Sequence, residues 1–207
     1  MTFEPARPGV TRFFYIATAV FEDHGAVARD LQELRHDLAK RGIHLPNGFH
    51  ATADRPGVRH EVLTVLKAHE FKVDVTLFEK AKANPTLRQS LTDFYSSAWY
   101  WHLKQVIPAR LGACPEVMVV AASINTKAKQ TAYHDALRVA IKDVAPRVPY
   151  SSAFWPASSD LCIQAADYCG WAVMRKWEVG DTSYYDRIRD HVGRQYDLFG
   201  RGTKRYF

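Results

Sequence analysis

The stretch from Ser158 to Tyr168, Ser-Ser-Asp-Leu-Cys-Ile-Gln-Ala-Ala-Asp-Tyr, opens a long run whose spacing predicts a helix ending near Trp177. If the helix begins at about Asp160, then Asp160, Gln164 and Asp167 are spaced i, i+4 and i+7 and share one stripe of its surface. Their neighbours are the apolar or small residues of a packed helix. Polar groups aligned in a mostly buried helix are unfavourable unless they bind something, so this helix is the first candidate for chemistry.

Two interpretations apply to the acids of this stripe. The carboxylates of Asp160 and Asp167 are oxygen ligands of the kind that Mg²⁺ or Mn²⁺ takes in proteins. Alternatively, Asp160 caps the helix, because an acid at that position accepts a backbone hydrogen bond and complements the helix dipole. Asp167 lies two turns further on, where capping does not account for it, and Gln164 either orients Asp167 or bridges to neighbouring backbone.

The same residues carry a family resemblance. Gln164-Ala-Ala-Asp167 continues as Tyr-Cys-Gly-Trp-Ala-Val-Met-Arg-Lys-Trp-Glu178, and upstream lie Phe49-His50-Ala51 and an early strand from Arg12 to Ile16. This pattern resembles the bacterial domain of unknown function 3800 family over nearly the whole chain, and the Gln-x-x-Asp element is its most specific part. The resemblance implies a single ribonuclease H-like domain over residues 1–207, an α/β layered fold with a mixed central sheet covered by helices.

The resemblance also implies a site. In ribonuclease H-like nucleases, acids from separate elements hold two metal ions that activate water and stabilise the leaving oxygen. Asp167 would then be a catalytic ligand of Mg²⁺ or Mn²⁺, with Asp160 as a second ligand and Gln164 in support. His50 would serve as general base, metal ligand or phosphate contact. The family usually begins with a strand ending in Asp-Glu-Ser-Gly, which this chain lacks; either that element was lost or the gene product starts upstream of Met1.

Outward from this helix, hydrophobic periodicity predicts short strands separated by helices, which is typical of an α/β layered domain. We expect strands at residues 12–21, 71–78, 116–122 and 150–155. We expect helices at residues 26–41, 54–69, 87–111 (capped by Thr86), 127–143, 159–177 and 182–196. The alternation in 71–78 indicates one wetter face, whereas the continuous apolar run in 116–122 indicates a strand buried on both faces.

A second polar segment, Ser123–Lys129, follows the expected strand 116–122. Ligands often bind beyond the carboxyl ends of strands in α/β domains, so Lys127 and Lys129 are candidates for contacts with substrate phosphate. The alternative is a polar capped loop, since Ser123 and Asn125 are poor metal ligands. The aromatic residues of the helix at 87–111 are expected to form core or a dimer interface rather than a base-stacking platform, which allows a homodimer.

Composition narrows the class of protein. The 207 residues are 47% apolar and 24% charged, which is ordinary for a soluble globular domain. The net charge of +6 is compatible with a polyanionic partner such as nucleic acid, but it is also common in proteins that bind none. Three cysteines without paired spacing indicate a reducing compartment. Since no segment has 18 consecutive apolar residues either, we expect a cytoplasmic protein without a membrane partner. The family resemblance implies a bacterial or phage protein.

Two hypotheses follow. The first is a metal-dependent nuclease of ribonuclease H-like fold, a hydrolase that loses activity in Asp167→Asn. The second is a catalytically silent module that binds nucleic acid or a protein on the same fold, since the Asp-Glu-Ser-Gly motif is missing and Ser123 and Asn125 follow the strand. The sequence lacks the signatures of nucleophilic hydrolases, P-loop proteins and dinucleotide-binding proteins.

Overall fold

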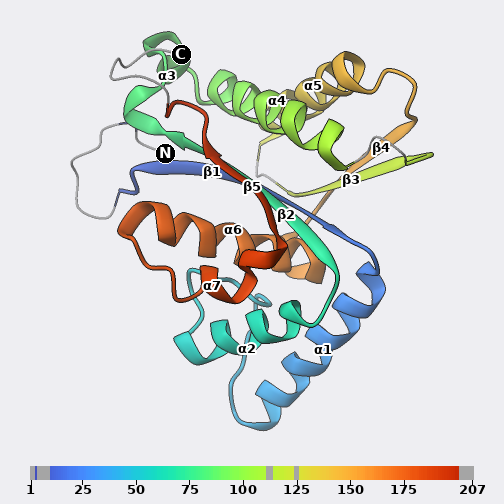
Figure 1. Ribbon diagram of the computed structural model, residues 1–207, viewed down its shortest axis with the longest axis vertical. Coiled ribbons are helices and arrows are strands. Elements are labelled where there is room, and N and C mark those ends of the chain that lie inside the picture. Colours follow the sequence, from blue (N-terminus) through green and yellow to red (C-terminus); the bar gives the residue numbers. More distant parts are fainter. Residues whose placement is uncertain (1–2, 4–9, 111–113, 124–125, 201–207) are drawn as a thin grey trace. The chain divides into compact units, whose positions relative to one another are not determined.

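The computed structural model describes residues 3, 10–110, 114–123 and 126–200, and it shows a mixed α/β protein (Figure 1). The chain forms two compact units. We call the first the α6 unit (Ala17–Val75 and Trp155–Gln195), after the helix α6 (Leu161–Val179). We call the second the α4–α5 unit (Met1–Ile16, Thr76–Phe154 and Tyr196–Phe207), after α4 (Leu91–Arg110) and α5 (Lys127–Val144). No helix in the described ranges is long and apolar enough to cross a lipid bilayer.

A three-stranded sheet has the order β1 (Phe13–Phe21), β2 (Phe71–Glu79), β5 (Val192–Asp197). Backbone bonds from Glu22 N to Glu70 O and from Lys80 N to Arg12 O make β1 antiparallel to β2. His191 stacks on Phe71 at one end and Leu198 N donates to Leu77 O at the other, so β5 runs parallel to β2. The sheet is therefore mixed, as expected.

The central position of β2 corrects the expectation of a wetter face. Asp74 and Thr76 are each only 1% exposed. The Asp74 carboxylate accepts a hydrogen bond from Arg194 N at 2.8 Å, and the Thr76 hydroxyl lies 2.8 Å from His102 Nδ1. These bonds compensate for the loss of water, so a strand that alternates in polarity is buried on both sides.

The α6 unit contains α1 (His24–Lys40), α2 (Pro56–Lys67), α6 (Leu161–Val179) and the short α7 (Tyr185–Ile188). The Asp23 carboxylate caps α1 by accepting from Ala26 N at 2.8 Å. Helices α1, α2 and α6 pack against one another, and the fully buried side chains of α1 are Val27, Leu31 and Leu38. The expected helix at 182–196 is wrong: after α7 the chain forms the short 3-10 helix Arg189–His191 and then β5.

The α4–α5 unit contains α3 (Pro85–Gln89), α4 (Leu91–Arg110), α5 (Lys127–Val144) and a separate two-stranded sheet of β3 (Val117–Ala122) and β4 (Tyr150–Trp155). The short helix α3 replaces the start of the single helix expected from 87, the long helix α4 follows it from Leu91, and the Asn84 side chain rather than Thr86 caps α3. Leu111, its expected end, lies outside the described residues. The expectation that 116–122 is buried on both faces is also wrong, because Met118 is 55% exposed.

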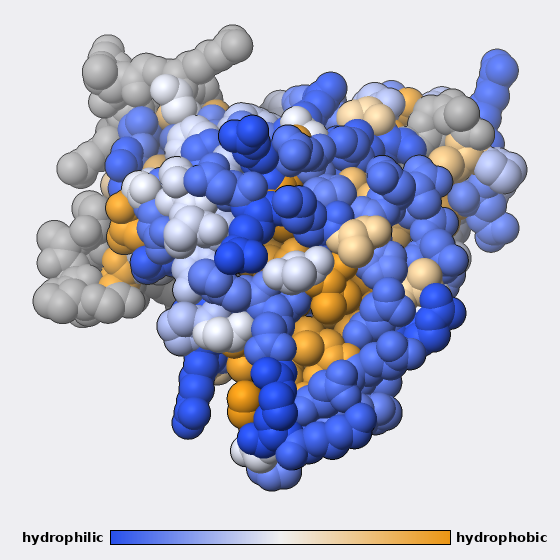
Figure 2. Space-filling view, turned by 60° about the horizontal axis from the view of Figure 1, so that its bottom comes forward, coloured by the Kyte–Doolittle hydropathy of each residue, from blue (hydrophilic) through white to orange (hydrophobic). Residues whose placement is uncertain are grey.

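Helices α4 and α5 pack along their length, and the core between them centres on Leu103, Ile107, Tyr133 and Leu137. Trp99 and Tyr95 pack against this core, as the sequence suggested, while Trp101 is 39% exposed. The face in Figure 2 is mostly hydrophilic, with a strip of hydrophobic residues visible between polar ridges.

Candidate functional site

The first residue of the predicted stripe, Asp160, is the N-cap of α6. Its side chain accepts a hydrogen bond from Ile163 N at 2.7 Å. This bond satisfies one of the backbone N–H groups that a helix leaves unpaired at its start. Asp160 therefore has the capping role that the sequence offered as the alternative to metal binding.

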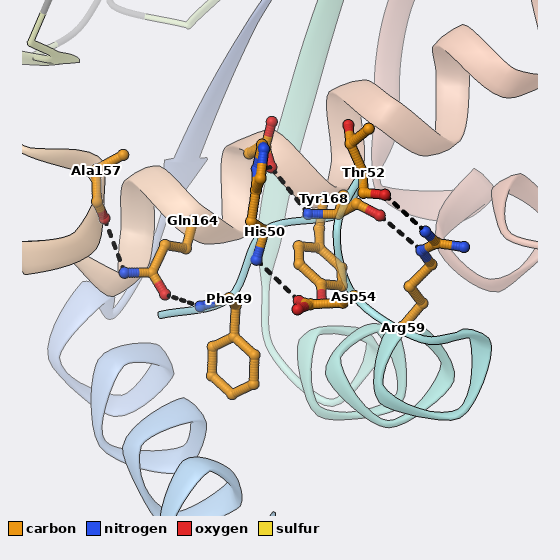
Figure 3. Close-up of polar contacts among 10 residues, drawn as sticks. Phe49, His50, Thr52, Asp54, Arg59, Ala157, Gln164 and Tyr168 are labelled. Carbon is orange, nitrogen blue, oxygen red and sulfur yellow. Dashed lines mark hydrogen bonds and ion pairs between the residues drawn. The ribbon is translucent and has the colours of Figure 1, made fainter. Parts of the chain in front are cut away.

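Gln164 connects α6 to the segment that holds His50. The amide is 3% exposed; its Oε1 accepts from Phe49 N at 2.8 Å and its Nε2 donates to Ala157 O at 2.8 Å (Figure 3). Because both ends of the side chain bind backbone, Gln164 positions the loop. Phe49 is itself 2% exposed and packs edge-on against Tyr168, with ring centroids 6.3 Å apart.

Gly48 allows this close approach. Its φ of +74° lies in the left-handed region, and a Cβ at this position would be 2.7 Å from Gln164 Oε1. Both the backbone conformation and the space therefore require glycine. The buried contact between residues 48–49 and Gln164 fixes where the next residue, His50, leaves the loop.

Asp167 contacts His50 directly. Asp167 Oδ2 lies 3.1 Å from His50 Nδ1 and accepts a hydrogen bond from Ala51 N, also at 3.1 Å. The side chains are 58% exposed for His50 and 30% exposed for Asp167, so both are open to solvent. An ionised carboxylate only accepts hydrogen bonds, so Nδ1 carries the proton, and in a neutral imidazole Nε2 is then the basic atom.

Two residues that sequence reasoning missed complete the loop. Asp54 Oδ2 accepts a hydrogen bond from His50 N at 2.8 Å and a short one from the Tyr168 hydroxyl. Asp54 is 8% exposed and Tyr168 is fully buried. Burial, with the Asp54 hydrogen bond, raises the pKa of Tyr168 far above its usual range, so the phenol remains a donor. Only the proximity of Tyr168 to Asp167 and of Asp54 to His50 in the sequence signalled them.

Arg59 holds the outer side of the loop. Its Nε donates to Ala51 O at 2.6 Å and its Nη2 donates to Thr52 O at 3.1 Å (Figure 3). The guanidinium lies over Trp171 at 4.5 Å from the ring centroid. Side chains thus bind the N–H groups of residues 49–51 from one side and the carbonyls of 51 and 52 from the other, which makes His50 part of a fixed loop.

Tyr168→Phe is expected to lower the free energy of unfolding by about 1–3 kcal/mol, because the buried Asp54 carboxylate loses a donor that water does not replace. Tyr133→Phe is the matched control: Tyr133 is equally buried, but its hydroxyl has no hydrogen-bond partner among the described residues. That change should be neutral or stabilising. Urea unfolding of both variants measures the difference, and equal losses would contradict the role given to the Tyr168–Asp54 bond.

Of the two carboxylates on this loop, Asp54 is buried and Asp167 is the one that a divalent metal ion could reach from solvent. Within the described ranges, no three His, Cys, Asp or Glu side chains gather into a metal-binding group. Asp167 Oδ2 has two partners, while Oδ1 has none among the residues described. Since Mg²⁺ keeps several waters when one or two carboxylates bind it, Oδ1 suits a single hydrated Mg²⁺ or Mn²⁺ ion rather than a two-metal centre.

A thiol nucleophile does not fit the start of α6. Cys162 is half-buried, and burial together with the nearby Asp160 carboxylate raises its pKa to about 11. At neutral pH the side chain is therefore a thiol, whereas the thiolate is the nucleophilic form. All three cysteines are free, and Cys169 is completely buried.

The second predicted segment lies in the α4–α5 unit. Lys127 is the exposed first residue of α5, and Lys129 is partly exposed two residues later. Ser123 is exposed after β3, and Asn125 lies outside the described residues. The structure thus brings His50, Gln164 and Asp167 together in the α6 unit and places both lysines in the other unit.

No protein-family model, curated protein or solved structure matches this chain. The chemistry of the site therefore has to be inferred from its own residues. What the loop and α6 present to solvent is an imidazole hydrogen-bonded to a carboxylate, the arrangement that orients a histidine for proton transfer.

Proposed function

We propose that this protein is a phosphodiester hydrolase of the nuclease type, in which His50 is the general base and Asp167 orients it. The observation that carries the proposal is the 3.1 Å contact between His50 Nδ1 and Asp167 Oδ2, with both side chains open to solvent. His50 and Asp167 are 117 positions apart in the sequence, and they meet at a loop that buried Gln164, Asp54 and Tyr168 hold in place. Such support by surrounding residues is what proton transfer requires of a site.

In this proposal, His50 Nε2 removes a proton from the water that attacks phosphorus. The P–O bond to the leaving oxygen breaks, and that oxygen takes up a proton from solvent water. Asp167 holds the imidazole in the tautomer with Nδ1–H and stabilises the imidazolium that forms. The hydrogen bond from Ala51 N keeps the Asp167 carboxylate in place while the proton moves. Because the His50 N–H is held by Asp54, the ring needs little reorganisation to reach a reactive geometry.

A single Mg²⁺ or Mn²⁺ ion would be held at Asp167 Oδ1. When bound, it would neutralise charge on the phosphate and polarise a phosphoryl oxygen. The chain's own residues account for the placement of the base. The net charge of +6 suits a nucleic-acid substrate.

The ribonuclease H-like fold and membership of the domain of unknown function 3800 family belong to the same proposal. The mixed sheet and the contact of Gln164 and Asp167 with residues 49–51 support them. The residues of this contact are among those that carry the sequence resemblance.

The decisive experiment is hydrolysis of labelled DNA and RNA by the purified protein with Mg²⁺, with Mn²⁺ and with EDTA. Cleavage is expected with metal and should fall by about 10²–10³-fold in Asp167→Asn, which loses the charge that stabilises the imidazolium. Asp186→Asn, an exposed acid in the same unit, is the control and should retain the wild-type rate. Cleavage that survives Asp167→Asn, or none by the wild type on any substrate, counts against the proposal.

A catalytically silent binding module is the second candidate. The observation that favours it is the capping role of Asp160: of the two predicted metal ligands, only Asp167 has its carboxylate on the loop. Such a module should bind nucleic acid or a protein equally well before and after His50→Ala. Titration with Mg²⁺ would then leave the His50 and Asp167 resonances in an NMR spectrum unchanged.

A further inference from the structure

The basic charge of this protein is concentrated in one of its two units. By sequence, the α6 unit has thirteen Lys and Arg against fifteen Asp and Glu, a net charge of −2. The α4–α5 unit has fifteen Lys and Arg against seven Asp and Glu, a net charge of +8. The excess of positive charge, which would attract a polyanion, therefore lies outside the unit that contains His50 and Asp167.

Within the α4–α5 unit, α5 presents a basic face. Lys127, Arg138 and Lys142 are exposed, and their spacings of 11 and 4 residues place them within a narrow arc of the helix. The opposite side of α5 is buried through Tyr133, Leu137 and three alanines, so the helix cannot rotate this face inward; the alanines are Ala132, Ala136 and Ala140.

The cations of this face have little competition from carboxylates. Lys127 and Lys142 have no ion-pair partner among the described residues. Arg138 pairs only with Asp135, at 3.4 Å, and both side chains are more than half exposed. An exposed pair of this kind contributes little and exchanges readily for another anion.

We propose that this face of α5 binds the phosphate backbone of nucleic acid. From Lys127 to Lys142 the helix rises about 22 Å, at roughly 1.5 Å per residue. A nucleic-acid strand carries one negative charge per nucleotide, so a strand that runs along this face can place a phosphate beside each of the three cations. The choice of nucleic acid rests on the proposed function, while the face itself is independent of His50 and Asp167.

A lipid surface fits this face less well. Helices that bind membranes carry large apolar side chains beside their basic residues, and those side chains enter the bilayer. On α5 the large apolar residues pack into the core with α4, and Val139 is the one that the helix exposes. Basic side chains without an apolar neighbouring stripe favour the regular charges of a phosphate backbone.

Fluorescence anisotropy of a labelled single-stranded oligodeoxynucleotide tests the proposal, in EDTA so that no cleavage occurs. The triple variant Lys127→Gln, Arg138→Gln, Lys142→Gln should bind at least about tenfold more weakly at moderate salt. The slope of log K against log salt should fall in magnitude by about 2, since each lost phosphate contact removes about 0.7 for single strands. Circular dichroism verifies that the helix content is unchanged.

The matched control is Arg29→Gln, Lys67→Gln, Arg189→Gln, which removes the same charge from exposed positions of the α6 unit. It should bind nearly as tightly as the wild type. Equal weakening in both triple variants would reduce the effect to net charge and overturn the proposal, as would no binding by the wild type. Stronger binding to phosphatidylserine vesicles than to the oligonucleotide would overturn it too.

The two proposals fail separately. His50→Ala should leave anisotropy unchanged, because His50 lies in the other unit. If the protein is a hydrolase, the α5 triple variant should still cleave bis(p-nitrophenyl) phosphate, which is too small to need the face. Binding without hydrolysis would support the α5 face and contradict the proposed nuclease. Hydrolysis without α5-dependent binding would support the nuclease and contradict the α5 face.

Discussion

Replacing His50 with alanine is expected to lower the rate of phosphodiester hydrolysis by about 10²–10⁴-fold, the usual contribution of a positioned general base. The loss should appear in kcat, because the imidazole acts on the attacking water rather than on substrate binding. Stability should change by less than about 0.5 kcal/mol, since the side chain is 58% exposed and the loop is held by backbone bonds that alanine retains. Steady-state kinetics with urea unfolding separates the two effects.

His44→Ala is the control, because His44 is an exposed histidine six residues away in the same unit. The double variant His50→Ala, Asp167→Asn should hydrolyse substrate only slightly more slowly than the less active of the two single variants, since two residues acting as one unit do not contribute additively. Additive losses would mean that His50 is not the base.

The elements that local pattern determines were predicted well. Helical spacing with a polar cap places α6 within two residues of the expected start and end, and the aromatic and β-branched stretch at 12–21 forms β1. The mixed α/β class is confirmed. The i, i+3 spacing of Gln164 and Asp167 predicts one face of one helix, and in the structure both side chains bind the loop at 49–51.

The errors arose where distant partners decide the outcome. Residues 192–197 have a pattern compatible with a helix but form β5, because pairing with β2 satisfies their backbone. Asp74 and Thr76 are buried only because Arg194 N and His102 bind them. Neither partner is visible in a local window, so alternation alone suggested a solvated face.

In the candidate site, too, the local features could be predicted from the sequence and the contacts between distant residues could not. Asp54 looked like the entry to α2, yet its carboxylate binds His50 N and Tyr168, 114 residues away. Its position four residues after His50 carried a signal for the first contact, but nothing in the sequence signalled the second. The stripe on α6 could be predicted because it is local, whereas the loop that the stripe binds could not.

Gly48→Ala is expected to lower the free energy of unfolding by about 3 kcal/mol. About 1–2 kcal/mol of this comes from forcing a residue with a Cβ into the left-handed region at φ +74°. The remainder comes from the clash with Gln164 Oε1, which must move and lose its hydrogen bond from Phe49 N. Because Phe49 adjoins His50, the same variant should also lose activity.

Gly42→Ala isolates the clash. Gly42 has φ +78° but nothing within 4 Å of its would-be Cβ, so this change should carry the backbone strain alone, about 1–2 kcal/mol. In a Gln164→Ala background, Gly48→Ala should become no worse than Gly42→Ala, since the atoms that collide are gone. If Gly48→Ala and Gly42→Ala are equally destabilising in the otherwise wild-type protein, then Gln164 does not contact the loop closely. In that case the inference that α6 positions His50 through Gln164 is wrong.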